Sequence, residues 1–158
     1  MKNMRHIEVV PYNPQWPSIF ELESSTIKAA LGDQLIAVHH VGSTAVSGLA
    51  AKPKIDMIIV VKDPLQTIGK FESIGFQYRG EYNIPLHYGF SKRGDVGVNL
   101  HVYEEGHPEI ELNLLFRDYL RNNPSVRDDY AALKIGLLQD ETSHQKENGA
   151  FTGYTLRK

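Results

Sequence analysis

The chain has 158 residues, of which 41% are hydrophobic and 23% charged, a composition typical of one soluble globular domain with a sizeable core. Its formal net charge of -2 provides no overall positive field, which argues against recruitment of nucleic acid or of an anionic membrane surface. It has no cysteine, which excludes disulfides and thiolate chemistry, and no apolar run of the roughly 20 residues that span a bilayer. Because the N-terminal residues also lack the apolar core of a signal peptide, we expect a single cytoplasmic domain over residues 1–158 with no membrane partner.

The first part of the chain predicts an edge strand followed by a helix. Residues 6–11 alternate loosely between apolar and polar side chains, and a proline ends this strand. Asn13 is a good helix N-cap residue, and Pro14 suits the first helical position. Residues 15–31 then carry apolar side chains at helical spacing, and Gly32 supplies the stop signal.

The middle of the chain predicts a β-sheet interrupted by one short helix. The helix covers residues 63–75, where an Asp-Pro pair supplies its start and a glycine its end. The clearest strand alternates valine and leucine on one face with Asn99 and His101 on the other. The expected strands are residues 34–41, 55–61, 76–78, 89–91 and 96–103.

After a turn at residues 106–108 the rest of the chain predicts helices. The first of them carries an apolar stripe of the kind that packs against a core, made of Leu112, Leu115, Phe116, Tyr119 and Leu120. An Asn-Pro pair at residues 123–124 starts a second helix, and a more polar helix is expected over residues 144–154. The order of elements therefore predicts an α/β (α+β) fold, a mixed sheet with helices packed on it and a helical C-terminal segment.

The most informative stretch joins the strands at residues 34–41 and 55–61. Gly42 and Ser43 offer a close backbone approach together with amide and hydroxyl donors, a combination that suits a phosphate. Asp56 lies inside an otherwise apolar strand, where an unpaired carboxylate would be costly. An anion cradle and a carboxylate in one hairpin-sized unit indicate Mg²⁺-nucleotide chemistry.

This arrangement of an apolar strand, Gly-Ser, a spacer and an apolar-Asp-apolar strand resembles the signature of the nucleotidyltransferase superfamily. The whole chain resembles, more specifically, the GrpB family of bacterial proteins, which has that fold. The matching segments are residues 10–17, 41–46, 48–53, 55–56, 78–81, 99–102 and 115–121. The resemblance implies a nucleotidyltransferase-like mixed sheet and, as an activity, transfer of a nucleoside monophosphate from a nucleoside triphosphate to a small-molecule or protein acceptor.

The site predicted on this basis has three overlapping parts. The expected catalytic residues are Asp56, His101 and Glu81, the nucleotide-binding residues are Gly42, Ser43 and Lys52, and the Mg²⁺ ligands are Asp56 and Glu81. His101 would bind a metal as a neutral imidazole or act as a general base. Lys52 and Lys54 precede the Asp56 strand, where a cation could meet a triphosphate.

The sequence also departs from the superfamily pattern. Active members carry a second carboxylate two residues after the first, and this chain has Ile58 there. Glu81, in a glycine-bounded loop, is the candidate for the missing carboxylate. In the family that loop often continues to an arginine that could hold an anion, whereas this chain has Leu86 and His87.

Each assignment has an alternative. Asp56 could pair with a neighbouring lysine, Glu81 and Lys52 could be solvated surface groups, and His101 could be a structural histidine of a half-buried sheet. Arg117 could either reach the cleft or tether its helix to the sheet. His39 and His40 are strand neighbours and point to opposite faces, which argues against a shared metal. The alternative function is a catalytically inactive module of the same fold that binds a nucleotide or another ligand.

Overall fold

A five-stranded mixed sheet forms the centre of the computed structural model, which describes residues 9–81 and 84–130. The strands lie in the order β1-β2-β5-β4-β3. Their bounds are Leu35–Val41 for β1, Lys54–Val61 for β2, Gln77–Glu81 for β3, Tyr88–Lys92 for β4 and Gly97–Glu104 for β5. The central pair β2 and β5 is parallel and the other neighbours are antiparallel, so the sheet is mixed, as predicted.

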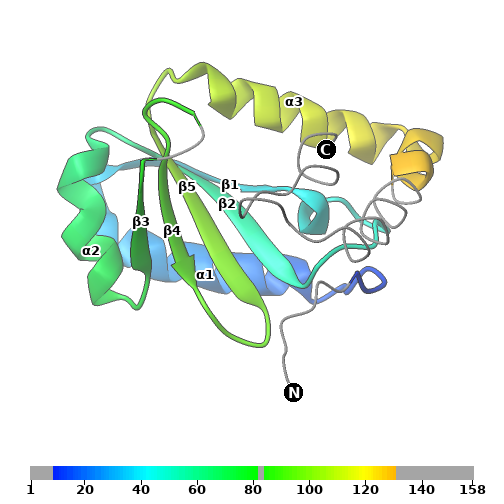
Figure 1. The fold of residues 1–158 in the computed structure, drawn as a ribbon, viewed down its shortest axis with the longest axis horizontal. Helices are drawn as coiled ribbons and strands as arrows, with labels where there is room; N and C mark the ends of the chain where they lie inside the picture. Colours follow the sequence, from blue (N-terminus) through cyan, green and yellow to red (C-terminus); the bar gives the residue numbers. More distant parts are fainter. Residues whose placement is uncertain (1–8, 82–83, 131–158) are drawn as a thin grey trace, which may run out of the picture.

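Helices cover both faces of this sheet (Figure 1). Helices α1 (Trp16–Leu31) and α2 (Ile68–Ser73) lie on one face, and α3 (Pro108–Asn122) crosses the other. Three short 3-10 segments connect the elements: η1 (Gly32–Gln34), η2 (Ser43–Ala45) and η3 (Pro64–Thr67). Residues 124–130 are again helical, as the Asn-Pro signal predicts.

The alternation along the two central strands separates a main core from a polar face. Alternate residues of β2 and β5 point toward α1 and α2 and are fully or almost fully buried; they are Ile55, Met57, Ile59, Val61, Val98, Leu100 and Val102. The residues between them point toward α3. The pairing register sets Asp56 beside Asn99 and Ile58 beside His101 on that second face. Burial of the apolar set therefore fixes which side chains the sheet presents to α3.

In the described part of the predicted N-terminal strand, residues 9–11, a single antiparallel bridge joins Val10 to Ala51, with backbone hydrogen bonds in both directions. Residues 6–8 of the predicted strand lie outside the described residues. The following helix starts later than predicted: its N-cap is Gln15 instead of Asn13, and the proline of its first turn is Pro17, because Asn13 and Pro14 belong to the turn before the helix. The predicted stop signal is confirmed, since the amide of Gly32 donates to the carbonyl of Lys28.

The apolar stripe predicted for α3 is the clearest error in the sequence-based fold. Of its five members only Leu120 is buried, whereas Leu112, Leu115, Phe116 and Tyr119 are 44–60% exposed. The side chains that pack toward the sheet are Ile110 and Leu114, which join a small cluster with residues of β1, β2 and β5. The predicted helix over residues 144–154 lies outside the described residues.

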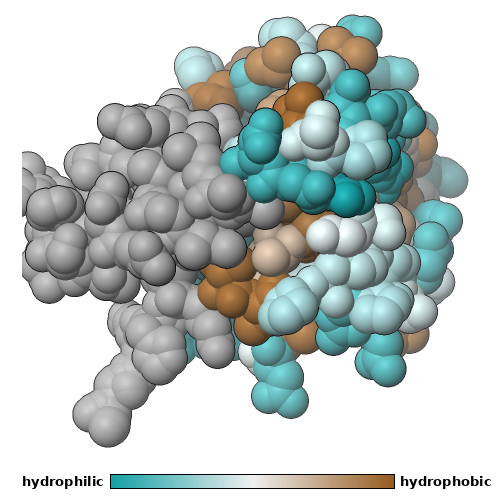
Figure 2. Space-filling view, turned by 90° about the vertical axis from the view of Figure 1, so that its right-hand side faces the viewer, coloured by the Kyte–Doolittle hydropathy of each residue, from teal (hydrophilic) through white to brown (hydrophobic). Residues whose placement is uncertain are grey.

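The surface is otherwise of mixed polarity. On the face shown in Figure 2, described hydrophobic residues form separate patches between larger hydrophilic areas. None of the helices found within residues 9–81 and 84–130 has both the length and the apolar character that a bilayer crossing requires.

Candidate functional site

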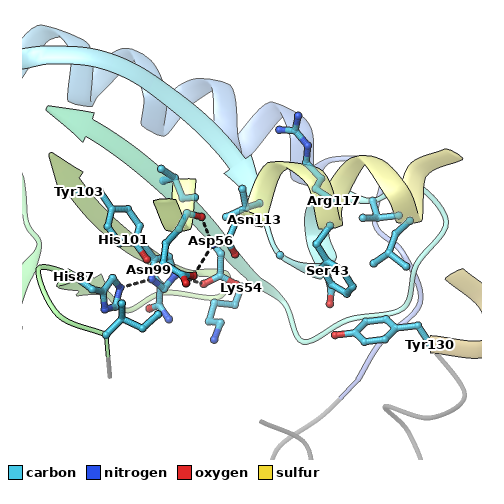
Figure 3. Close-up of a pocket in the computed structure, with 18 residues that line it drawn as sticks. Ser43, Lys54, Asp56, His87, Asn99, His101, Tyr103, Asn113, Arg117 and Tyr130 are labelled. Atoms are coloured by element: carbon cyan, nitrogen blue, oxygen red, sulfur yellow. Dashed lines mark hydrogen bonds and ion pairs between the residues drawn. The ribbon is translucent and has the colours of Figure 1, made fainter. Parts of the chain in front are cut away.

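A cavity of about 270 Å³ lies on the polar face of the sheet, between the central strands, the Gly-Ser loop and α3 (Figure 3). Asp56 and Ile58 reach it from β2, and Asn99 and His101 reach it from β5. Both the second-position Ile58 and the two polar β5 residues therefore lie where the strand alternation predicted them. The cavity is lined by both polar and apolar side chains and lies on the face of the sheet opposite the main core.

The Gly-Ser loop packs directly on the carboxylate of the central strand. Gly42 has a positive φ of +78°, and a Cβ at this position would lie only 2.8 Å from Oδ2 of Asp56. A residue with a side chain would therefore be strained by the backbone conformation and would also collide with the carboxylate. The structure brings together the two halves of the predicted motif, although 13 positions separate them along the chain.

Asp56 begins a row of hydrogen-bonded side chains along one wall of the cavity (Figure 3). Its Oδ1 lies 3.2 Å from Nε2 of His101, and Nδ1 of His101 lies 2.9 Å from Nε2 of His87. Because an ionised carboxylate only accepts, His101 donates through Nε2, and a neutral His101 then accepts the Nε2 proton of His87. The row contains one acid and two imidazoles, and His87 is only 3% exposed.

The loop that precedes β4 carries His87 to this position. Glu81 accepts a hydrogen bond from the amide of Leu86, and Nε2 of His107 donates to the carbonyl of Pro85 at 3.0 Å. Nδ1 of His107 accepts from the amide of Glu109 at 3.1 Å, which caps α3. Glu81 thus holds the loop and is not among the residues that line the cavity. The structure does not bring Glu81 to Asp56 as a second carboxylate.

Some of the basic residues line the cavity and others do not, a difference that the sequence did not indicate. Lys54 lines the cavity, whereas Lys52 is not among its lining residues. Arg117 lines it too, but its guanidinium donates to the carbonyl of His40 at 3.1 Å and pairs with Asp118 at 2.9 Å. Arg117 therefore both reaches the cavity and tethers its helix to the sheet.

Ser43 lies at the opposite end of the cavity from the histidines, beside Tyr130 (Figure 3). Burial raises the pKa of the Tyr130 phenol to about 12, and its hydrogen bond with the Ser43 hydroxyl opposes that shift. Tyr130 thus stays neutral near pH 7 and adds a phenol to the polar lining. Tyr130 was not among the residues that the sequence predicted for the site.

The Gly-Ser loop is also held from the side of the main core. Nε2 of His40 lies 3.0 Å from the Thr44 hydroxyl, which donates to the carbonyl of Lys54 at 3.1 Å. Since that hydroxyl has only one proton, His40 must donate through Nε2. Burial, together with the positive charges of Arg121 and Arg117, lowers the pKa of His40 to about 4, and the Asp56 carboxylate opposes this shift. His40 stacks on Phe20 of α1 and pairs with Met57 of the main-core face, whereas His39 pairs with Ile58 of the cavity face, so the two histidines do face opposite sides.

The donor set fits one oxygen-bound cation and does not fit two. Across the described part of the chain, no group of three or more His, Cys, Asp or Glu side chains converges as a ready metal site. Mg²⁺ is usually held by one or two carboxylates, substrate phosphates and water, and Asp56 can supply one such carboxylate. A pair of metals needs several shared carboxylates, and Ile58 and Asn99 occupy the neighbouring positions.

The fold is similar to that of nucleotidyltransferase-fold proteins of known structure. The Cid1 poly(U) polymerase with Mg 3'-dATP bound superposes with a TM-score of 0.61 over 94% of this chain and 49% of that chain, at 10% identity. At such low identity the similarity defines the fold alone. The crystal structure of the conserved protein GrpB from Enterococcus faecalis is closer, with a TM-score of 0.79, 34% identity and 85% of each chain covered.

The sequence comparisons give the family. The family described as GrpB protein matches residues 6–158, and the UPF0157 protein YqkA of Bacillus subtilis is 39% identical over 138 residues, or 84% of this chain. The chain belongs to the GrpB family. The chain spans only 40% of the length of YqkA. A Mycobacterium tuberculosis protein named dephospho-CoA kinase is 30% identical over 155 residues, which are 80% of this chain. The chain spans 38% of the length of that protein.

Proposed function

We propose that the cavity binds a nucleoside triphosphate together with a single Mg²⁺ ion. The observation that carries this proposal is the contact between the Gly42 backbone and the Asp56 carboxylate. A phosphate held by the loop amides and the Ser43 hydroxyl would then lie beside the one central carboxylate of the sheet. A Mg²⁺ ion bound between the phosphate and the carboxylate would neutralise the negative charges of both groups.

Different residues would bind the metal and the triphosphate. Oδ2 of Asp56, which faces Gly42, would hold the metal, while Oδ1 stays with His101. Lys54 replaces Lys52 as the cation for the triphosphate, because Lys54 lines the cavity. Glu81 is assigned to the loop instead of the metal. The bound Mg²⁺ would supply charge neutralisation of the phosphates.

Two of the compared proteins guide the choice of ligands. The printed description of the Cid1 structure names a bound Mg 3'-dATP, and the name dephospho-CoA kinase concerns a coenzyme that contains adenine. ATP and dephospho-CoA therefore belong in the ligand panel beside CTP, GTP and UTP. The activity of a kinase of which this chain spans 38% is not carried over.

The binding test is thermal stabilisation by each nucleotide with and without Mg²⁺. At about 100-fold over Kd, a ligand stabilises by about 2.7 kcal/mol, which raises the Tm of a domain of this size by roughly 5–10 °C. We expect Asp56→Asn to abolish the Mg²⁺-dependent part of the shift. Asp95→Asn, the same change at an exposed loop position, should leave it intact. Absence of a shift with every nucleotide, or an equal shift in both variants, contradicts the proposal.

A second candidate function is transfer of the nucleoside monophosphate, and the row from Asp56 to His87 favours it. An acceptor hydroxyl or amine would form a bond to the α-phosphorus, the bond to the β-phosphate oxygen would break, and pyrophosphate would leave. The acceptor proton would pass to the pair of imidazoles, and Asp56 would stabilise the resulting imidazolium on His101.

This reaction is tested by pyrophosphate release with pools of hydroxyl and amine acceptors. His101→Gln should lower the rate by about 100-fold or more, because a lost general base has that effect, while nucleotide-induced stabilisation persists. Stabilisation by nucleotide without pyrophosphate release from any pool would assign the chain to the binding module instead.

A further inference from the structure

A second and larger cavity, of about 710 Å³, opens beside the candidate site. It lies between η3, the loop before β4, the end of β5 and the start of α3. Ile84 and Glu109 line both cavities, so the two adjoin each other at these residues. We call this second cavity the acidic groove.

The lining of the acidic groove is strongly negative. Its described residues include the carboxylates of Asp63, Glu104, Glu105 and Glu109, and among them there is no lysine or arginine. The whole chain has a formal net charge of only -2, so this concentration of charge is local. The pKa of the Tyr88 phenol, which also lines the groove, is raised first by burial and then by nearby carboxylates that include Asp63 and Glu104.

The groove also exposes apolar side chains. Leu65 is 59% and Leu86 is 53% exposed, and both belong to its lining together with three prolines. Leu86 is held in place from two sides, because Glu81 binds its amide and His107 binds the carbonyl of Pro85. Large apolar side chains that are fixed at the edge of a cavity are typical of sites where a partner docks.

We propose that the acidic groove binds a short segment of a partner protein that carries lysine or arginine beside apolar side chains. Charge complementarity argues for this occupant: the carboxylates would meet the cationic groups while Leu65 and Leu86 cover the apolar ones. The same charges would repel nucleic acid, and they disfavour a second copy of this negatively charged chain. The acidic groove is thus a recognition site for a basic polypeptide.

The position of the groove gives this partner a role. A segment bound there would run past Ile84 and Glu109, so one of its side chains could reach the cavity that contains Asp56. The bound segment would then be the acceptor, or the protein that presents it. This last step rests on the proposed function, whereas the docking itself does not.

Docking is tested by fluorescence anisotropy with a labelled short peptide that alternates leucine and lysine, in the absence of nucleotide. Matched peptides that alternate leucine with glutamate, or glycine with lysine, separate the charged from the apolar contribution. We expect the leucine–lysine peptide to bind at least tenfold more tightly than either. Equal affinity for all three, or no binding of any, overturns the proposal.

Two variants locate the binding. Glu104→Gln with Glu105→Gln should weaken the leucine–lysine peptide at least tenfold, while Glu21→Gln with Glu72→Gln, at exposed positions of α1 and α2, should not. Leu86→Gly keeps the positive φ accessible and removes only the side chain, and it should also weaken binding. Circular dichroism checks that each variant folds. Equal losses in both glutamine pairs would place the peptide elsewhere, and nucleotide-induced stabilisation, measured separately, reports on the proposed function alone.

Discussion

Asp56 and Gly42 show how two residues define a site that neither could define alone. Asp56 is one of the few polar side chains of β2, and it stays on the cavity face because the other face packs into the main core. Gly42 lets the loop backbone come close to that carboxylate. The two effects are separate. Strand alternation places the Asp56 side chain in the cavity, and the lack of a side chain at Gly42 allows the loop backbone to approach it.

The first prediction concerns Gly42→Ala. The substitution combines a positive φ with a Cβ placed 2.8 Å from Oδ2 of Asp56, so we expect a loss of about 2–4 kcal/mol in the free energy of unfolding, measured in urea. Gly32→Ala is the matched control, because Gly32 also has a positive φ but has nothing within 4 Å of its Cβ position. The control should lose about 1–2 kcal/mol. Similar losses in both variants would mean that the contact with Asp56 has no energetic consequence.

The residues of the site differ in how far the sequence could predict them. Gly42, Ser43 and Asp56 follow from a local pattern, and His101 follows from strand alternation once its strand is placed. Glu81 was predicted in a loop, but it is the last residue of β3 and pairs with Tyr88 of β4, and the sequence pattern did not show that this strand extends beyond residue 78. His87 was seen as a departure from the family pattern, but its contact with His101 requires the antiparallel pairing of β4 with β5.

At the scale of elements, α3 is fastened to the Gly-Ser loop by arginines and not by the predicted apolar stripe. Arg117 donates to the carbonyl of His40, Arg121 to that of Ala45, and Arg127 of the following helical segment to that of Ser47. These carbonyls belong to the end of β1 and to the Gly-Ser loop. The charged heads therefore satisfy loop backbone groups that would otherwise be left without partners.

This arrangement explains why hydrophobic periodicity failed for α3 and succeeded for α1. In α1 the buried positions are largely apolar, so the pattern and the packing agree. In α3 Arg117, whose side chain is 17% exposed, lies on the inward face with Ile110 and Leu114, and a pattern that counts arginine as polar rotates the predicted face away from the sheet. The helix itself was predicted correctly, because its end signals do not depend on which face is buried.

The second prediction concerns Arg121→Met, which keeps a long apolar stem and removes the donor to Ala45. We expect a loss of about 1–2 kcal/mol in the free energy of unfolding, because a buried carbonyl loses its partner. Hydrogen exchange should also accelerate at the amides of Ala45 and Val46, which bond within the loop. Arg79→Met, which removes a bond to the exposed side chain of Ser91, is the control and should leave those amides unchanged. Unaltered protection of the loop in Arg121→Met would show that α3 does not hold it.

At the scale of the whole molecule, the sheet separates an apolar core from a polar face, and His40 connects the two. Its ring stacks on Phe20 of the core side, and its Nε2 holds Thr44 in the loop that forms the site. A charge on this ring would lie near Arg121 and Arg117 in a buried setting. The stability of the fold and the integrity of the site should therefore respond together to pH.

The last prediction concerns how protonation of His40 changes the stability of the fold. The unfolded chain takes up the His40 proton near pH 6.5, whereas the folded chain does so only near pH 4. The unfolded state therefore binds more protons between these values, so this contribution to stability is complete above pH 6.5 and is lost as the pH falls toward 4. A shift of this size corresponds to a loss on the order of 2–3 kcal/mol, measured by urea unfolding at pH 7 and at pH 4. His40→Gln retains a donor for Thr44 but cannot titrate, so its stability should fall by correspondingly less over the same interval. If the variant and the wild type lose the same free energy, groups other than His40 control the acid sensitivity, and the link between core and site through this ring is wrong.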